Sequence, residues 1–167
     1  MEDGRSHYGV RLRLDGVERL MVWYSDESDG VLTSSPGRIA LFKDPAEVER
    51  YATQQNLKLE PEPVALYDFD RLAQWLAQPS REALDCRFLL DAWNMLCDVA
   101  FSVGAKIEER RDAQGVYDKL FWGCNLPSMT PPGEHFEPRW SDEDVLILSE
   151  VLSSGLRLLR GAVRHAA

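Results

Sequence analysis

The segment from Tyr117 to Trp140 combines aromatic surface with side chains that can form hydrogen bonds or exchange protons. Aromatic and polar residues are interspersed along it: Tyr117, Asp118, Lys119, Phe121, Trp122, Asn125, His135, Phe136 and Trp140. Four prolines limit its backbone freedom: Pro127, Pro131, Pro132 and Pro138. An ordered loop of this kind presents side chains at low entropic cost, and such loops are often binding surfaces.

Two kinds of chemistry are open to this segment. We expect six of its side chains to contact a binding partner: Tyr117, Asp118, Trp122, Asn125, His135 and Trp140. The aromatic residues can instead pack under the loop and seal the edge of the core, and Asp118 and Asn125 also suit turns. Acid–base catalysis by Asp118 and His135 requires the two side chains to be close, which the sequence does not show. The sequence therefore assigns no catalytic residue.

The sequence lacks the common motifs of catalytic and cofactor-binding sites. The chain has no GxGxxG, GxxxxGK[ST], GxSxG, HExxH or DxDxDG pattern and no CxxC pair. Its histidines are three, His7, His135 and His165, and the first and last lie near the chain ends. We therefore expect neither a metal site nor a cofactor.

The charge of the chain limits the class of partner. Its 167 residues include 19 Lys and Arg against 28 Asp and Glu, a net charge of −9. That sign argues against binding to a nucleic acid backbone and permits a basic protein partner. The excess acid lies mostly in residues 44–70 and 134–150, each with a net charge of −5. If these two segments are neighbours in space, one face of the protein is strongly negative.

The cysteines and the apolar stretches indicate a compartment. Cys86, Cys97 and Cys124 are odd in number and lie in apolar surroundings, as small buried side chains do in a reducing environment. The chain begins with a polar, acidic stretch unlike a signal peptide, and no apolar run is long enough to span a membrane. We expect a cytoplasmic protein that does not bind membranes.

The elements that must position these residues begin with a hairpin. Tyr8–Leu14 and Val17–Tyr24 flank Asp15-Gly16, a pair that suits a two-residue type I′ turn. This turn fixes a register in which Val10 lies opposite Met21 and Arg13 opposite Glu18. We expect a third strand at Arg38–Phe42 and a short strand at Leu57–Leu59.

Helices are predicted by their caps and by the spacing of apolar residues. One runs from Asp44 to about Gln55, and a second from Asp68 to a point before Pro79. The clearest spans about 85–104 and is apolar nearly all round, which indicates a buried central helix. Its polar positions form one stripe that either faces solvent or lines a pocket: Arg87, Asp91, Asn94, Asp98 and Ser102. A last helix, capped by Ser141, spans about 142–160.

These elements predict the α+β class, with a small antiparallel sheet from the N-terminal half packed against the helices. We expect a single domain, 1–167, with loose ends at about 1–6 and 161–167. The expected function is that of a non-enzymatic acidic binding protein of bacterial inhibitor or immunity type, which neutralises a basic protein such as a toxin. The alternative is a small enzyme or ligand-binding domain with a pocket between the central helix and a loop at 117–140, using Asp118, Asn125 and His135.

Overall fold

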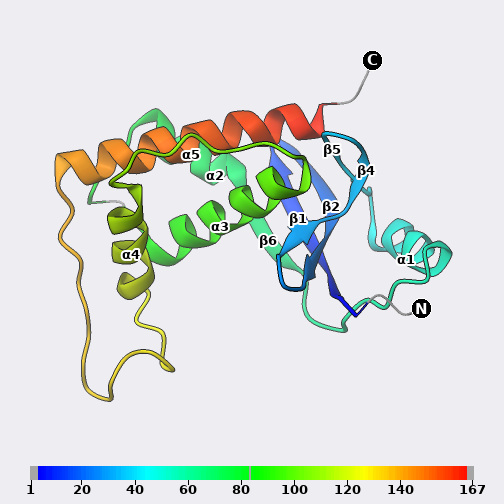
Figure 1. The fold of residues 1–167 in the computed structure, drawn as a ribbon, viewed down its shortest axis with the longest axis horizontal. Coiled ribbons are helices and arrows are strands. Elements are labelled where there is room, and N and C mark those ends of the chain that lie inside the picture. Colours follow the sequence, from blue (N-terminus) through cyan, green and yellow to red (C-terminus); the bar gives the residue numbers. More distant parts are fainter. Residues whose placement is uncertain (1–3, 83, 165–167) are drawn as a thin grey trace.

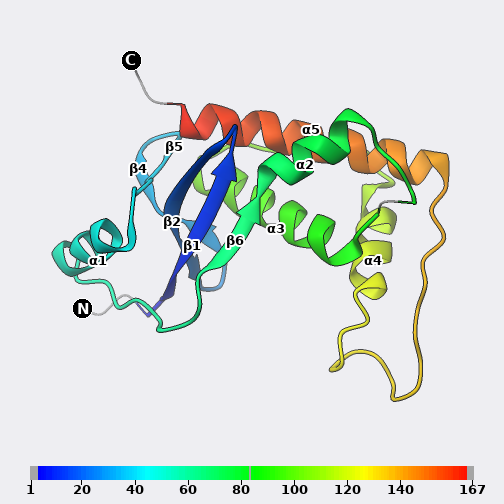
Figure 2. The ribbon, with the colours of Figure 1, turned by 180° about the vertical axis from the view of Figure 1, so that it is seen from behind.

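The computed structural model describes residues 4–82 and 84–164 and has the predicted α+β architecture. A four-stranded sheet has the order β3-β2-β1-β6, and β4 and β5 pair in a small second sheet. Helices α2, α3 and α5 cover one face of the larger sheet, while α1 lies near the other face (Figures 1 and 2). The elements are β1 (Ser6–Leu14), β2 (Val17–Ser25), β3 (Gly30–Val31), β4 (Thr33–Ser35), β5 (Arg38–Ile39), α1 (Pro45–Gln54), β6 (Ala65–Asp68), α2 (Phe69–Ala77), α3 (Cys86–Ser102), α4 (Ala113–Gly123) and α5 (Asp142–Val163).

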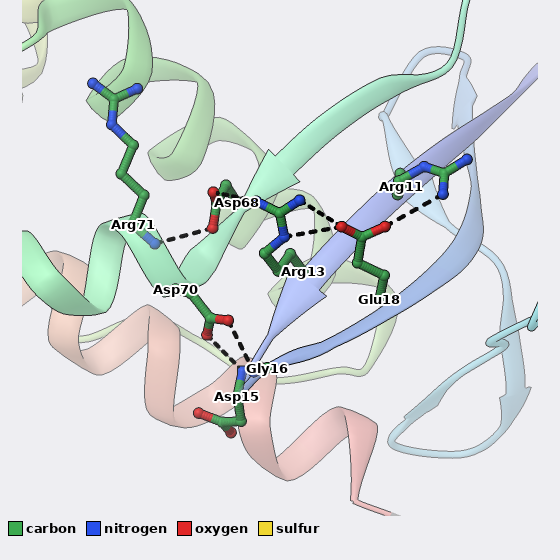
Figure 3. Close-up of polar contacts among 8 residues, drawn as sticks. All are labelled: Arg11, Arg13, Asp15, Gly16, Glu18, Asp68, Asp70 and Arg71. Carbon is green, nitrogen blue, oxygen red and sulfur yellow. Dashed lines mark hydrogen bonds and ion pairs between the residues drawn. The ribbon is translucent and has the colours of Figure 1, made fainter.

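The predicted hairpin forms in the predicted register. Val10 lies opposite Met21 and Arg13 opposite Glu18, and both turn residues, Asp15 and Gly16, have positive φ. Asp70, in the first turn of α2, accepts hydrogen bonds from the backbone N–H groups of both turn residues (Figure 3). The hairpin tip is therefore attached to α2 by a carboxylate that belongs to the first acidic segment.

The remaining strands differ from the expected ones. β6 was not predicted; it pairs parallel to β1 and makes the sheet mixed rather than wholly antiparallel. The strand expected at Arg38–Phe42 is only the two-residue β5, which pairs with β4, and Phe42 makes a single bridge to Leu20. Of the strand expected at Leu57–Leu59, only a bridge between Leu59 and His7 forms. Short strands such as these carry too few residues for a period-two pattern to be read.

Helix α3 lies at the centre of the core, as its all-round apolar surface predicts. It contacts α5, α4, β3 and α2. Eight of its residues are buried: Leu89, Leu90, Ala92, Trp93, Met95, Leu96, Val99 and Ala100. Asp85 caps its first turn, and Gly104 follows its end with a φ of 70°.

The polar stripe of α3 fastens the helix to its neighbours. Asp98 accepts a hydrogen bond from Trp23 Nε1 of β2 at 2.9 Å, and Ser102 Oγ accepts one from the Val31 N–H of β3 at 2.8 Å. Asn94 Oδ1 accepts the Tyr117 hydroxyl of α4 at 2.7 Å. Burial raises the pKa of Asp98, and the bond from Trp23 opposes that shift. The stripe is thus not a purely solvated edge, and one of its residues, Asp91, lines a pocket of about 100 Å³ beside β6.

Two helices differ from the sequence-based expectation. Residues 113–123 form α4, so Tyr117, Asp118 and Trp122 lie on a helix rather than in a loop at 117–140. α5 starts at the predicted Ser141 cap but continues to Val163, beyond the expected end at 160. The expected loose ends are shorter, since Ser6 begins β1 and Ala162 is buried; residues 1–3 and 165–167 lie outside the described residues.

The close contact between α3 and α5 gives a matched test of the packing. A Cβ atom at Gly155 of α5 would lie 2.8 Å from Leu96 Cδ1 and 3.1 Å from Leu96 Cβ, whereas one at Gly161 of the same helix meets nothing within 4 Å. We expect Gly155→Ala to lower the free energy of unfolding by about 1–3 kcal/mol through overpacking. Gly161→Ala should raise it by up to about 1 kcal/mol through helix propensity. Urea denaturation of both variants checks this, and a stabilised Gly155→Ala variant would contradict the packing described.

Candidate functional site

Residues 124–140, named here the projecting loop, connect α4 to α5 and extend away from the body of the molecule (Figures 1 and 2). Both figures show the loop running outward from the end of α4 and returning to the start of α5. Its position leaves it accessible to another molecule, so the contacts that give it a defined shape decide what it can do.

Ion pairs hold the two helices that carry the loop. Lys119 of α4 donates to Asp144 of α5 at 2.6 Å and to the Arg139 carbonyl oxygen at 3.1 Å. Arg81 donates to Asp142 at 2.8 Å and to the Trp140 carbonyl oxygen at 3.2 Å. These contacts fix the C-terminal end of the projecting loop against the body.

Asn125 closes the loop upon itself. Its side-chain amide donates to the Phe136 carbonyl oxygen at 2.9 Å, and its Oδ1 accepts the Phe136 backbone N–H at 2.7 Å. Asn125 also has a φ of 47°, a left-handed conformation that asparagine tolerates better than most residues. One side chain thus connects two parts of the loop that are 11 residues apart in sequence.

Three exposed apolar side chains surround a pocket at this clamp. Trp122 is 44% exposed, Met129 49% and Phe136 46%. They line a cavity of about 330 Å³, together with Thr130, Pro131, Glu134 and His135. Exposed apolar groups gathered at one concave place mark an interaction site more often than the same groups scattered singly.

The structure places the six predicted site residues in different environments. Trp122 and His135 line the pocket, and Asn125 shapes the loop through Phe136. Tyr117 and Trp140 are half-buried against the core, and the Tyr117 hydroxyl is held by Asn94. Asp118 is exposed on α4 and accepts a hydrogen bond from Gln114 of the same helix. Two of the six therefore pack as the core-sealing interpretation expects.

The catalytic alternative needs Asp118, Asn125 and His135 at one place. These three side chains contact other residues instead of one another. Asp118 bonds to Gln114, Asn125 to Phe136, and His135 lies 3.7 Å from Glu137. His135 lines the pocket at Trp122, while Asp118 and Asn125 do not. Of the three residues that the alternative names, only His135 therefore lines the pocket at the loop, where it lies with Glu134 among mostly apolar side chains.

The sequence missed Met129 and Glu134 as site residues. They lie on either side of Pro132-Gly133, and Gly133 has a φ of 81°. The turn there returns the chain, so that Met129 and Phe136 face the same pocket. The Pro-Gly pair is a turn signal that points to this reversal, but the sequence does not say which side chains meet across it.

The two acidic segments do not form one face. α1 of the first segment and the first turns of α5 in the second lie at opposite ends of the molecule in both views (Figures 1 and 2). Most of their carboxylates also have structural contacts. The contacts in the first segment are made by Asp44, Glu47, Asp68 and Asp70. Those in the second are made by Asp142, Glu143, Asp144 and Glu150.

The cysteines and the other potential metal ligands give no sign of a reactive site in the described residues. All three cysteines are free, and burial raises the pKa of both Cys86 and Cys97 to about 11, so these thiols are protonated at neutral pH. Within residues 4–82 and 84–164, no three His, Cys, Asp or Glu side chains are grouped to hold a metal ion. In the same residues, every helix is too short or too polar to cross a bilayer.

The chain was compared with protein-family models, with curated proteins and with solved structures. No protein-family model, no curated protein and no solved structure matches the chain.

Proposed function

We propose that this protein is a non-enzymatic binding protein of inhibitor or immunity type, which neutralises a basic protein partner such as a bacterial toxin. The contact surface is the end of α4 and the projecting loop. One observation carries the proposal: Trp122, Met129 and Phe136 are exposed around one pocket on a loop that Asn125 holds in shape. The partner inserts an apolar side chain into that pocket.

The apolar groups supply the affinity. Binding energy in protein interfaces is concentrated in a few buried anchors, among which tryptophan is common. Covering exposed apolar surface releases the water that contacts it, and the clamp between Asn125 and Phe136 lowers the entropy lost when the loop binds. A small pocket lined mostly by apolar side chains, together with a few polar ones, is suited to the centre of an interface.

The charges supply the choice of partner. Glu134 lines the pocket. Glu137 follows three residues later in the loop, and its side chain is 87% exposed. They add a local negative field to a chain whose net charge is −9. Such a field favours a basic protein and disfavours nucleic acid, and it raises the association rate. The free thiols of the three cysteines agree with a cytoplasmic location.

A tryptophan substitution tests the pocket. We expect Trp122→Ala to weaken binding of the basic partner about thirtyfold or more, because truncation of an interface anchor costs about 2 kcal/mol or more. Phe101→Ala is the matched control, since Phe101 is 58% exposed on α3 and does not line this pocket. Affinity capture from native extract, followed by titration of the purified partner, measures both variants. Equal binding by the wild type and Trp122→Ala would remove the pocket from the interface.

A pair of double charge reversals tests where the acidity acts. Glu134→Lys with Glu137→Lys changes the net charge as much as Glu49→Lys with Glu62→Lys, whose residues are exposed and lie in α1 and in the segment between α1 and β6. We expect the loop variant to slow association strongly at low salt and the α1-side variant to slow it only slightly. Stopped-flow association rates at two salt concentrations give the answer. Equal slowing by both variants would mean that only the total charge matters.

The clamp of the loop can be removed by a substitution that still allows the positive φ at position 125. Asn125→Gly keeps the positive φ accessible and deletes both hydrogen bonds to Phe136. We expect faster hydrogen exchange of the Phe136 amide, weaker partner binding and little change in the unfolding temperature. Unchanged exchange at Phe136 would show that other contacts hold the loop.

A further inference from the structure

A second pocket lies at the opposite end of the molecule from the projecting loop, where the β4–β5 hairpin meets the C-terminal end of α5 (Figures 1 and 2). Its volume is about 380 Å³, within the range of small-molecule sites. β5 contacts α5 directly, and Tyr51 of α1 closes another side. Elements distant in sequence therefore build this pocket together.

The lining of this pocket combines apolar residues with two arginines. Ile39 and Ala162 are buried apolar residues of its wall, and Phe42 packs on Tyr51 with ring centroids 5.1 Å apart. The charged lining residues are Arg38 and Arg164, and among residues 4–82 and 84–164 no Asp or Glu belongs to the lining. In a chain with a net charge of −9, a pocket with two arginines and no carboxylate is a local exception.

Arg38 carries an unsatisfied donor. Its Nη1 atom is buried and has no hydrogen-bond partner among residues 4–82 and 84–164. A buried polar atom without a partner is costly, and a cationic one more so, which is why such groups in native proteins usually have an acceptor. Ser34 and Ser35 also line the pocket, and their hydroxyl groups are further possible donors to an anion.

We propose that this pocket binds a small carboxylate that has an apolar body. The carboxylate accepts hydrogen bonds from the Arg38 guanidinium, whose planar fork matches two carboxylate oxygens, and Arg164, which also lines the pocket, adds positive charge. The apolar body covers Ile39, Phe42 and Tyr51. The site is separate from the protein-binding loop and stands independently of the proposed function.

Titrations with defined probes test the charge and the apolar body separately. The acids are butyrate, octanoate and 4-phenylbutyrate; the controls are 4-phenylbutyramide, acetate and inorganic phosphate. Calorimetry measures affinity, and backbone amide shifts report whether Ile39, Leu41 and Val163 respond. We expect saturable binding that is tighter for 4-phenylbutyrate than for butyrate, with the neutral amide and acetate each weaker by about tenfold or more.

Two arginine variants complete the test. Arg38→Gln should weaken the best acid by about tenfold or more, while Arg157→Gln, which removes the same charge from α5 outside this pocket, should leave it unchanged. Arg38→Gln should also unfold at the same or a higher temperature, because it removes the buried Nη1 donor that has no partner. Arg164→Gln provides a second, milder variant. The proposal is overturned if none of the acids saturates, if amide or phosphate binds as tightly as the acid, or if Arg38→Gln binds normally.

Discussion

Burial of helix α3 is the constraint on which the rest of the structure depends. Its apolar surface is too wide to be covered by one neighbour, so the sheet, α2, α4 and α5 all pack around it. Its single polar stripe then fixes how two of those neighbours sit, through Asp98 to Trp23 and through Asn94 to Tyr117. Because α4 is held in this way, the loop that leaves it projects from a rigid base.

Several of the acidic side chains of this molecule stabilise its fold through ion pairs and hydrogen bonds. The acidic residues at the start of α5 form ion pairs with Arg81, Arg110 and Lys119, which come from three other segments. Their negative charges also interact favourably with the positive end of the helix dipole. Asp68 and Asp70 hold the start of α2 and the hairpin turn (Figure 3). At the projecting loop, the acidic side chains are Glu134, which lines the apolar pocket, and the exposed Glu137, and the proposed recognition depends on these two.

Local patterns predicted the local elements well. The Asp15-Gly16 turn fixed the hairpin register, and the side-chain caps at Asp44, Asp68 and Ser141 located three helix starts. Helix α4 was missed because Gly115 and the preceding charged run weaken its apolar period, and Asp112 makes no side-chain cap. The bonds between Asn125 and Phe136 could not be predicted, since they depend on how a proline-rich loop reverses. The separation of the two acidic segments likewise depends on tertiary packing.

The central claim is that the projecting loop is the surface that meets a basic protein. Hydrogen–deuterium exchange of this protein, alone and saturated with that partner, tests it most directly because it reports every amide at once. The account predicts slower exchange in the complex at the loop, in particular around Met129 and Phe136, with α1 unchanged. Protection confined to α1 or to the C-terminal end of α5, with the loop exchanging as in the free protein, would contradict it.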